Sequence, residues 1–306
     1  MREALKPVSA LLISVAILLT GQGLQGTLLP IRASVESFST TSIGLMGAAY
    51  FLGFTIGCLL GVYFVKRVGH IRVFLAMTAI ASTTALIHAL LLFPSIWILM
   101  RMLTGFCFAV LFVVIESWVN DRSSNENRGV IFSVYVMITL TVQAAGQFLI
   151  LLYEPNGVEL FAITSILVTL AAIPIALSTS PAPYIDQNTS FDLKKLYKIS
   201  PAAVIGCLFI GLANGSFWSL APIFISDVFA DISFTAYFMT AVIVGGAIFQ
   251  WPIGYLSDKI GRRKITIITA AFSATISFLI VSMIDTLNLS GLIITGIFWG
   301  GLTFPL

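Results

Sequence analysis

The chain has 306 residues, of which 58% are hydrophobic and only 9% are charged. Soluble domains carry about a quarter charged residues, so this composition excludes an ordinary soluble domain and indicates a protein that lies in lipid. The net charge of +3 is small, so the position of each charge says more than the total.

Apolar runs long enough to cross about 30 Å of hydrocarbon follow one another along the chain. They predict ten transmembrane helices, the last incomplete, at residues 8–30, 43–65, 73–93, 96–119, 130–153, 160–178, 201–222, 234–256, 265–284 and from 289 onward. The expected fold class is therefore an all-α membrane protein.

The basic residues are distributed unevenly between the two sides of this helix array. Fourteen of the 16 Lys and Arg residues fall in segments on one side, while Arg32 lies in a loop on the other side and Arg101 lies inside a helix. Because loops rich in Lys and Arg stay in the cytoplasm, this pattern predicts a multi-pass protein with a cytoplasmic N-terminus.

Residues 22–72 recur further along the chain with a constant offset of 192. The offset aligns Gln22 with Asn214 and Gly69 with Gly261, without a gap. Since a fixed offset over two apolar segments indicates a duplicated structural unit, the sequence predicts two related halves. Six predicted spans separate the copies, so both are expected to cross the membrane in the same direction.

The duplication also predicts the domain organisation. We expect an N-terminal six-helix bundle at 1–180, a cytoplasmic linker at 181–200 and a C-terminal bundle at 201–306. The second copy stops at a point inside the fourth helix of the first. By its own symmetry the chain is expected to be a fragment, truncated within helix 10, with about 9.5 of 12 helices.

The turn after the eighth predicted helix carries the motif that resembles a known family. Residues 254–264 read GYLSDKIGRRK, which resembles the signature G-x-L-x-D-(R/K)-x-G-R-(R/K) of the major facilitator superfamily (MFS). Gly261 permits a tight reversal between helices, and the basic cluster favours a cytoplasmic turn. The motif positions are Gly254, Asp258, Gly261, Arg262 and Arg263.

The corresponding turn of the first copy departs from this pattern. Lys66 stands where the signature has an acid, whereas Arg67, Gly69 and Arg72 keep its basic and glycine character. Two further strings fit the family. Arg101 followed by Gly105 is similar to the arginine motif of its fourth helix. The string from Glu116 to Asp121, followed by Arg128, resembles that of a poorly characterised bacterial branch.

The resemblance implies a secondary active transporter with the MFS fold, in which helices 1, 4, 7 and 10 line a central cavity. Polar residues near the midpoints of these helices and of helix 5, which lies behind them, are therefore the candidates for substrate binding. They are Gln22, Gln25, Arg101, Gln143, Asn214 and Trp218. The alternative for the amides is interhelical hydrogen bonding. For Arg101 it is snorkelling to the membrane interface.

The candidates for gating are the residues of the two basic turns together with a pair at the cytoplasmic ends of helices 4 and 5. They are Lys66, Arg67, Gly69, Arg72, Glu116, Arg128, Gly254, Asp258, Gly261, Arg262 and Arg263. Glu116 has two open interpretations, a proton carrier or an ion-paired gate.

Three further features have structural interpretations. Trp97, Trp118 and Trp251 match an interfacial aromatic belt. The spacing of four between Gly53, Gly57 and Gly61 predicts close helix packing. His88 is expected to be structural.

The predicted function is transport of a small solute by alternating access, coupled to protons. A channel or a membrane receptor is the alternative, and drug/proton antiport and metabolite uptake both remain open. The sequence contains no catalytic, nucleotide-binding or metal-binding motif, so we expect no enzyme, cofactor, metal or nucleic-acid partner. The expected protein is a monomer in a bacterial plasma membrane.

Overall fold

The computed structural model describes residues 8–124, 128–178, 197–229, 231–286 and 288–303. Within these ranges the chain is helical and contains no strand. Nine helices of the described residues are long and apolar enough to cross a membrane, and a tenth, α13 (Leu289–Thr303), is apolar but shorter. The predicted class of all-α membrane protein is confirmed.

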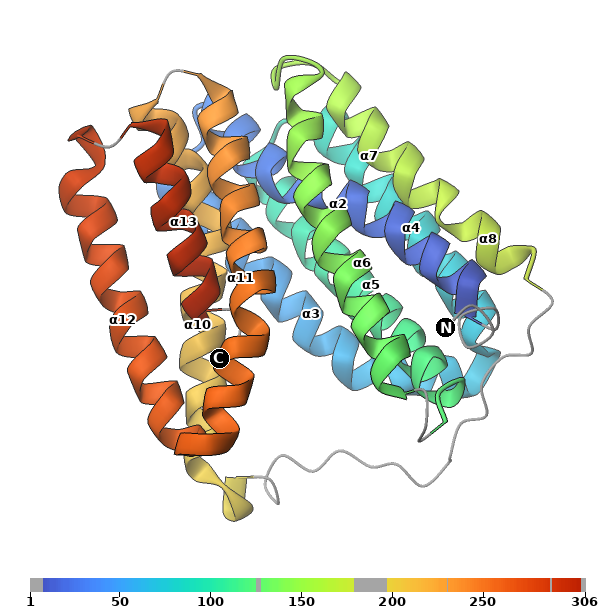
Figure 1. Ribbon diagram of the computed structural model, residues 1–306. Helices are drawn as coiled ribbons and strands as arrows, with labels where there is room; N and C mark the ends of the chain where they lie inside the picture. The colour runs from blue at the N-terminus through green and yellow to red at the C-terminus, as the bar shows by residue number, and fades with distance from the viewer. Residues whose placement is uncertain (1–7, 125–127, 179–196, 230, 287, 304–306) are drawn as a thin grey trace.

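Helices α2 to α8 form one bundle, drawn in blue to yellow-green in Figure 1. They are α2 (Ser9–Val35), α3 (Thr40–Val68), α4 (His70–Leu90), α5 (Pro94–Asp121), α6 (Arg128–Phe148), α7 (Glu159–Leu170) and α8 (Ala172–Ala176). The short 3-10 turn η2 (Leu149–Leu151) follows α6, and a break at Ala171 divides the sixth predicted span into α7 and α8.

A second bundle contains the helices drawn in yellow to red in Figure 1. They are α10 (Pro201–Val228), α11 (Ile232–Ile260), α12 (Arg262–Met283) and α13, with the 3-10 turn η3 (Ile284–Thr286) between the last two. The linker predicted between the bundles lies mostly in 179–196, outside the described residues, so the domain boundaries stay a prediction.

The structure repeats itself with the offset that the sequence predicted. Ser39 caps α3 and Asp231 caps α11, each by accepting a backbone N–H bond, and the two residues are 192 positions apart. Gly69 and Gly261, also 192 apart, both have positive φ, of 87° and 103°. Only glycine adopts this backbone region without strain, so both reversals require it.

The glycines that join helices are repeat mates as well. A Cβ atom at Gly53 would overlap the carbonyl oxygen of Met102, and one at Gly245 would overlap that of Ile297. The helices α3 and α5 therefore pack backbone against backbone, and α11 and α13 do the same. The predicted close packing of the glycine stripe at residues 53, 57 and 61 is confirmed for Gly53 and Gly57.

We name the two ends of the molecule by these features. The capped end carries the Ser39 and Asp231 caps, and the basic end carries the turns at Gly69 and Gly261. At the capped end Ile31 and Ile43 of the first bundle share a buried cluster with Ala236 of the second. Since corresponding ends meet, the repeats are parallel, as predicted.

The bundles contact each other on the capped half of the molecule. Thr240 of α11 donates a hydrogen bond to the carbonyl oxygen of Ala144 of α6 at 3.3 Å, and the rings of Phe148 and Tyr237 lie 5.7 Å apart. Toward the basic end, Leu208 of α10 is 61% exposed. Figure 1 accordingly shows the bundles converging at the upper edge and diverging toward the lower edge.

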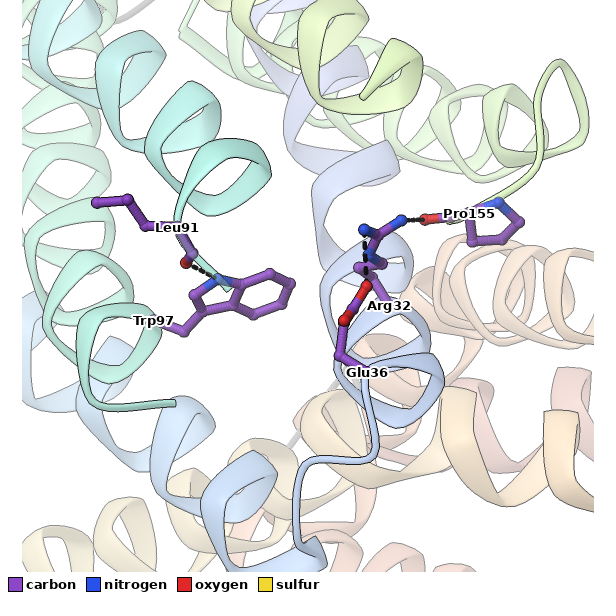
Figure 2. A network of polar contacts seen from close by, with 5 residues as sticks. All are labelled: Arg32, Glu36, Leu91, Trp97 and Pro155. Atoms are coloured by element: carbon purple, nitrogen blue, oxygen red, sulfur yellow. Dashed lines mark hydrogen bonds and ion pairs between the residues drawn. The ribbon is translucent and has the colours of Figure 1, made fainter. Parts of the chain in front are cut away.

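The capped end of the first bundle is fixed by buried polar groups, shown in Figure 2. Arg32, in the last turn of α2, pairs with Glu36 at 2.7 Å and donates to the carbonyl oxygen of Pro155 at 3.0 Å. Nearby, the indole N–H of Trp97 donates to the carbonyl oxygen of Leu91 at 2.9 Å. Arg32 thus ties the end of α2 to the segment between α6 and α7.

The aromatic-belt prediction is wrong for two of the three tryptophans. Trp97 and Trp118 are buried within protein, whereas Trp251 is 77% exposed. Trp97 packs edge-on against His88, whose Nδ1 lies 2.6 Å from the carbonyl oxygen of Thr84. The structural interpretation of His88 fits this buried packing.

The glycine contacts predict a matched set of substitutions. Gly105→Ala is expected to lower the free energy of unfolding by about 1–3 kcal/mol, because the new methyl group overlaps the carbonyl oxygen of Tyr50. Gly300→Ala should lower the free energy of unfolding by a similar amount, because its methyl group overlaps the carbonyl oxygen of Val242. Gly206→Ala is the control, since no described atom beyond its chain neighbours and the nearby backbone of its own helix lies within 4 Å of its Cβ position, and it should be neutral or stabilise by about 0.5–1 kcal/mol. Thermal unfolding in detergent measures all three, and equal stability of the three variants would contradict backbone contact.

Arg32→Met is expected to cost about 1–3 kcal/mol, since it leaves the Glu36 carboxylate and the Pro155 carbonyl without their partner. Lys264→Met removes an exposed charge and should change stability by less than about 0.5 kcal/mol. The same unfolding measurement compares them. An Arg32 variant as stable as the Lys264 variant would show that the contacts of Arg32 drawn in Figure 2 do not stabilise the fold.

Candidate functional site

A cavity of about 300 Å³ lies between the bundles near the middle of the helices. The first bundle contributes residues of α2, α3, α5 and α6, and the second bundle contributes residues of α10 and α11. Polar and aromatic side chains line it: Gln22, Gln25, Tyr50, Phe51, Phe54, Arg101, Phe112, Gln143, Gln147, Trp218 and Ser219.

Glycine contacts bring the amide side chains of α2 and α6 together. A Cβ atom at Gly23 would lie 2.6 Å from the carbonyl oxygen of Gln143, and Gly146 lies against the same stretch of α2. Because the two helix backbones touch at this point, Gln22 on α2 and Gln143 on α6 reach the same cavity. The glycines of α2 and α6 thus position the polar side chains that form this wall of the cavity.

Arg101 lies in the wall formed by α5, beside α3. Its Cζ atom sits 4.4 Å from the centre of the Tyr50 ring, and the Tyr50 hydroxyl accepts a hydrogen bond from Gln22 Nε2 at 3.1 Å. Within the part of the chain that the structure describes, the guanidinium makes no ion pair. The described residues that line the cavity include no acid, so the formal charge of this lining is that of Arg101.

Two amide atoms at the cavity lack a hydrogen-bond partner among the described residues. They are Oε1 of Gln22 and Nε2 of Gln25, and the Gln25 side chain is only 3% exposed. Gln147, next to them, has a partner because its Oε1 accepts a bond from Thr27. An unpaired buried polar atom costs about 1–3 kcal/mol, so these two atoms are poised to bind a group that enters the cavity.

Five of the six residues predicted to bind substrate line this cavity: Gln22, Gln25, Arg101, Gln143 and Trp218. Asn214 does not, although it is the repeat mate of Gln22. It lies one turn before Trp218 on α10. The repeated helix is therefore present in both bundles, but Asn214 does not reach the cavity that Gln22 lines.

Sequence reasoning missed Tyr50, which contacts both Gln22 and Arg101. A signal was present, because Tyr50 precedes Gly53 by three residues and so shares the helix face of the glycine stripe. That stripe was predicted to pack closely, but its partner helix could not be identified from one sequence.

The predicted gating residues gather at the basic end. Most lie exposed there, among them Lys66, Arg67, Arg72, Asp258 and Arg262. Glu116 is also exposed, and among the described residues it forms no ion pair with Arg128, whose guanidinium instead lies 5.6 Å from the Phe132 ring. Both interpretations of Glu116 stay predictions.

Comparisons with known proteins agree with this architecture. The family model described as Major Facilitator Superfamily matches residues 11–306. An uncharacterized MFS-type transporter of Escherichia coli O17:K52:H18, YcaD, is 27% identical over 260 residues, which cover 84% of this chain and 68% of that protein.

Solved structures share the fold at low sequence identity. A mutant of the nucleoside transporter NupG superposes with a TM-score of 0.81 at 16% identity, over 97% of this chain and 80% of that one. A bacterial homolog of the human lysosomal transporter Spinster, in an inward-facing and unoccupied conformation, gives 0.74 at 13% identity, over 99% and 73%. A D-xylose-proton symporter gives 0.69 at 15% identity, over 97% and 79%. This chain, a multi-pass integral membrane protein, belongs to the Major Facilitator Superfamily of transporters.

Proposed function

We propose that the protein is a secondary active transporter that moves a small solute by alternating access. The observation that carries this proposal is the central cavity, which takes its walls from both bundles while the bundles touch on the capped half. A rocking motion of two bodies about such a site would expose it to one side of the membrane at a time.

We propose that the protein lies in a bacterial plasma membrane with its basic end facing the cytoplasm and its N-terminus on the same side. The basic turns at Gly69 and Gly261 support this orientation through the retention of Lys and Arg in the cytoplasm. The shape described above would then be the inward-facing state. The turns between α3 and α4 and between α11 and α12 would latch the cytoplasmic face in the opposite state.

We further propose coupling to protons. The part of the cavity lining that the structure describes has no acid, so Glu116 near the basic end is the protein group that we propose to carry the proton. One solved structure of similar fold is described as a D-xylose-proton symporter, which supports this kind of coupling without identifying the solute. Drug export and metabolite uptake both fit the cavity.

Flux in proteoliposomes tests the proposal for the full-length protein. A solute found by a thermal-shift screen should enter vesicles with saturation, show counterflow from preloaded vesicles, and accumulate when a proton gradient is imposed. Flux that rises linearly with solute concentration and shows no counterflow would indicate a channel instead. A receptor would bind the solute and give no flux.

Alternating access also predicts the effect of a substitution at the capped end. A Cβ atom at Gly47 of α3 would overlap the side chain of Ser219 of α10, so Gly47→Leu should prevent the bundles from closing there. Gly44→Leu, one turn earlier on α3, is the matched control because no described atom beyond its chain neighbours and the nearby backbone of α3 lies within 4 Å of its Cβ position.

The measurement is labelling of Gly26→Cys, a cavity position with free space around it, by an impermeant maleimide added to intact cells. The exposed Cys58 and Cys207 are first replaced by serine. Gly47→Leu should raise the labelling several-fold, whereas Gly44→Leu should leave it unchanged. Equal labelling in the two variants would contradict a capped-end closure.

Arg101 is the one cation among the described residues that line the cavity, and its removal is expected to affect stability and transport in opposite directions. Arg101→Met should stabilise the solute-free protein by about 1–3 kcal/mol, because it removes a charge that lacks an ion pair among the described residues, while transport is lost. The direction is opposite to that expected for Arg32→Met. Thermal unfolding and vesicle flux measure the two effects, and a destabilised Arg101 variant would show that the arginine serves the fold.

A further inference from the structure

Among the described residues, those that line the cavity carry one formal charge and no counter-charge. Arg101 supplies the charge, and this described lining includes no Asp or Glu. A cation in a protected site of low dielectric is costly unless an anion pairs with it. Since the described part of the protein supplies no such anion at the site, the bound solute is the natural source.

The geometry of Arg101 favours a planar anion. Its Cζ atom lies over the Tyr50 ring, 4.4 Å from the ring centre, and among the described residues the guanidinium makes no ion pair that would occupy its N–H groups. A guanidinium edge presents two parallel donors that match the two oxygens of a carboxylate. Tyr50 also restricts the motion of the guanidinium, which lowers the entropy lost on binding.

Comparison of the two repeats shows that the second bundle has no counterpart of this charge at the matching position. The glycine contacts align Tyr50 with Val242 and Gly105 with Gly300, because each glycine faces the carbonyl oxygen of its partner. Four residues before Gly105 and Gly300 stand Arg101 and Gly296. The second bundle therefore has a valine and a glycine where the first has the tyrosine and the arginine.

Apolar and aromatic side chains complete the lining. Trp218 and Ile243 come from the second bundle, and Phe51 and Phe54 come from α3, where their ring centres lie 5.3 and 6.2 Å from that of Tyr50. The lining also holds two atoms without a partner among the described residues, Oε1 of Gln22 and Nε2 of Gln25. The first requires a donor from the solute and the second requires an acceptor.

We propose that the solute is an organic monoanion with a carboxylate bound by Arg101 and an aromatic or apolar body directed toward Trp218. The proposal rests on the transport function proposed above and adds the chemical class and the orientation of the solute. Arg101 repels cationic solutes, and a neutral solute would leave it without a counter-charge. A single arginine also neutralises a monoanion completely but leaves one charge of a phosphate dianion uncompensated.

The test compares acids with their neutral amides, which have nearly the same shape. The full-length protein in detergent is titrated with benzoate and benzamide, salicylate and salicylamide, nicotinate and nicotinamide, and phenylacetate and phenylacetamide, and separately with inorganic phosphate. Each Kd is obtained from the rise in unfolding temperature with concentration. At least one acid should stabilise the protein more than its amide and more than phosphate does.

Two substitutions of Arg101 assign the preference to the cavity. Arg101→Gln should weaken binding of that acid by about 10- to 100-fold and abolish its advantage over the amide, since it removes a charge-assisted hydrogen bond. Arg101→Lys should keep part of the advantage through its charge.

The matched control is Lys259→Gln, which removes a cation that also stacks on a tyrosine. The Nζ atom of Lys259 lies 4.5 Å from the centre of the Tyr255 ring, and neither residue lines the cavity. This variant should bind the acid as the parent protein does, because the charge that it loses is remote from the proposed carboxylate.

The proposal is overturned if the amides stabilise the protein as much as the acids do, if no acid stabilises it, or if the preference for the acid survives in Arg101→Gln. These outcomes are distinct from a failure of the transport function. Saturable uptake and counterflow of a neutral solute would uphold the transporter and overturn the anion. An acid that binds through Arg101 but is never transported would uphold the site and overturn the transporter.

Discussion

Direct contact between helix backbones is the constraint on which the rest of this structure depends. Lipid tails are as apolar as the side chains that face them, so helices in a membrane gain little from the hydrophobic effect when they associate. Close packing must supply the attraction instead. In this chain Gly53 and Gly105 join α3 to α5, Gly23 and Gly146 join α2 to α6, and Gly245 and Gly300 join α11 to α13.

The same contacts position the candidate site. Because α3 and α5 touch at Gly105, the guanidinium of Arg101, one turn before this glycine, lies over the Tyr50 ring. Because α2 and α6 touch at Gly23, their amides line a common wall. Scaffold and site are thus specified by overlapping stretches of sequence, and the rigid helices hold the polar groups at defined positions.

The two copies share their backbone features, whereas the side chains that face the cavity differ between them. The caps, the glycine turns and the backbone contacts recur in both copies. The side chains that face the cavity do not, since a tyrosine and an arginine in one copy correspond to Val242 and Gly296 in the other. Two bundles with corresponding backbone contacts and unequal polarity would hold a solute in one orientation.

The sequence by itself determined the helices, their parallel duplication and the glycine reversals, because these follow from local composition and from a numerical offset between residues. It also indicated five of the residues that line the cavity, since a polar side chain in the middle of an apolar helix is costly unless it faces a partner or a cavity. The tertiary structure alone decided which helices touch. It therefore brought Tyr50 to Arg101, left Asn214 outside the cavity and buried Trp97 and Trp118. Such contacts depend on how two helices cross, and the crossing is fixed by residues far apart in the chain.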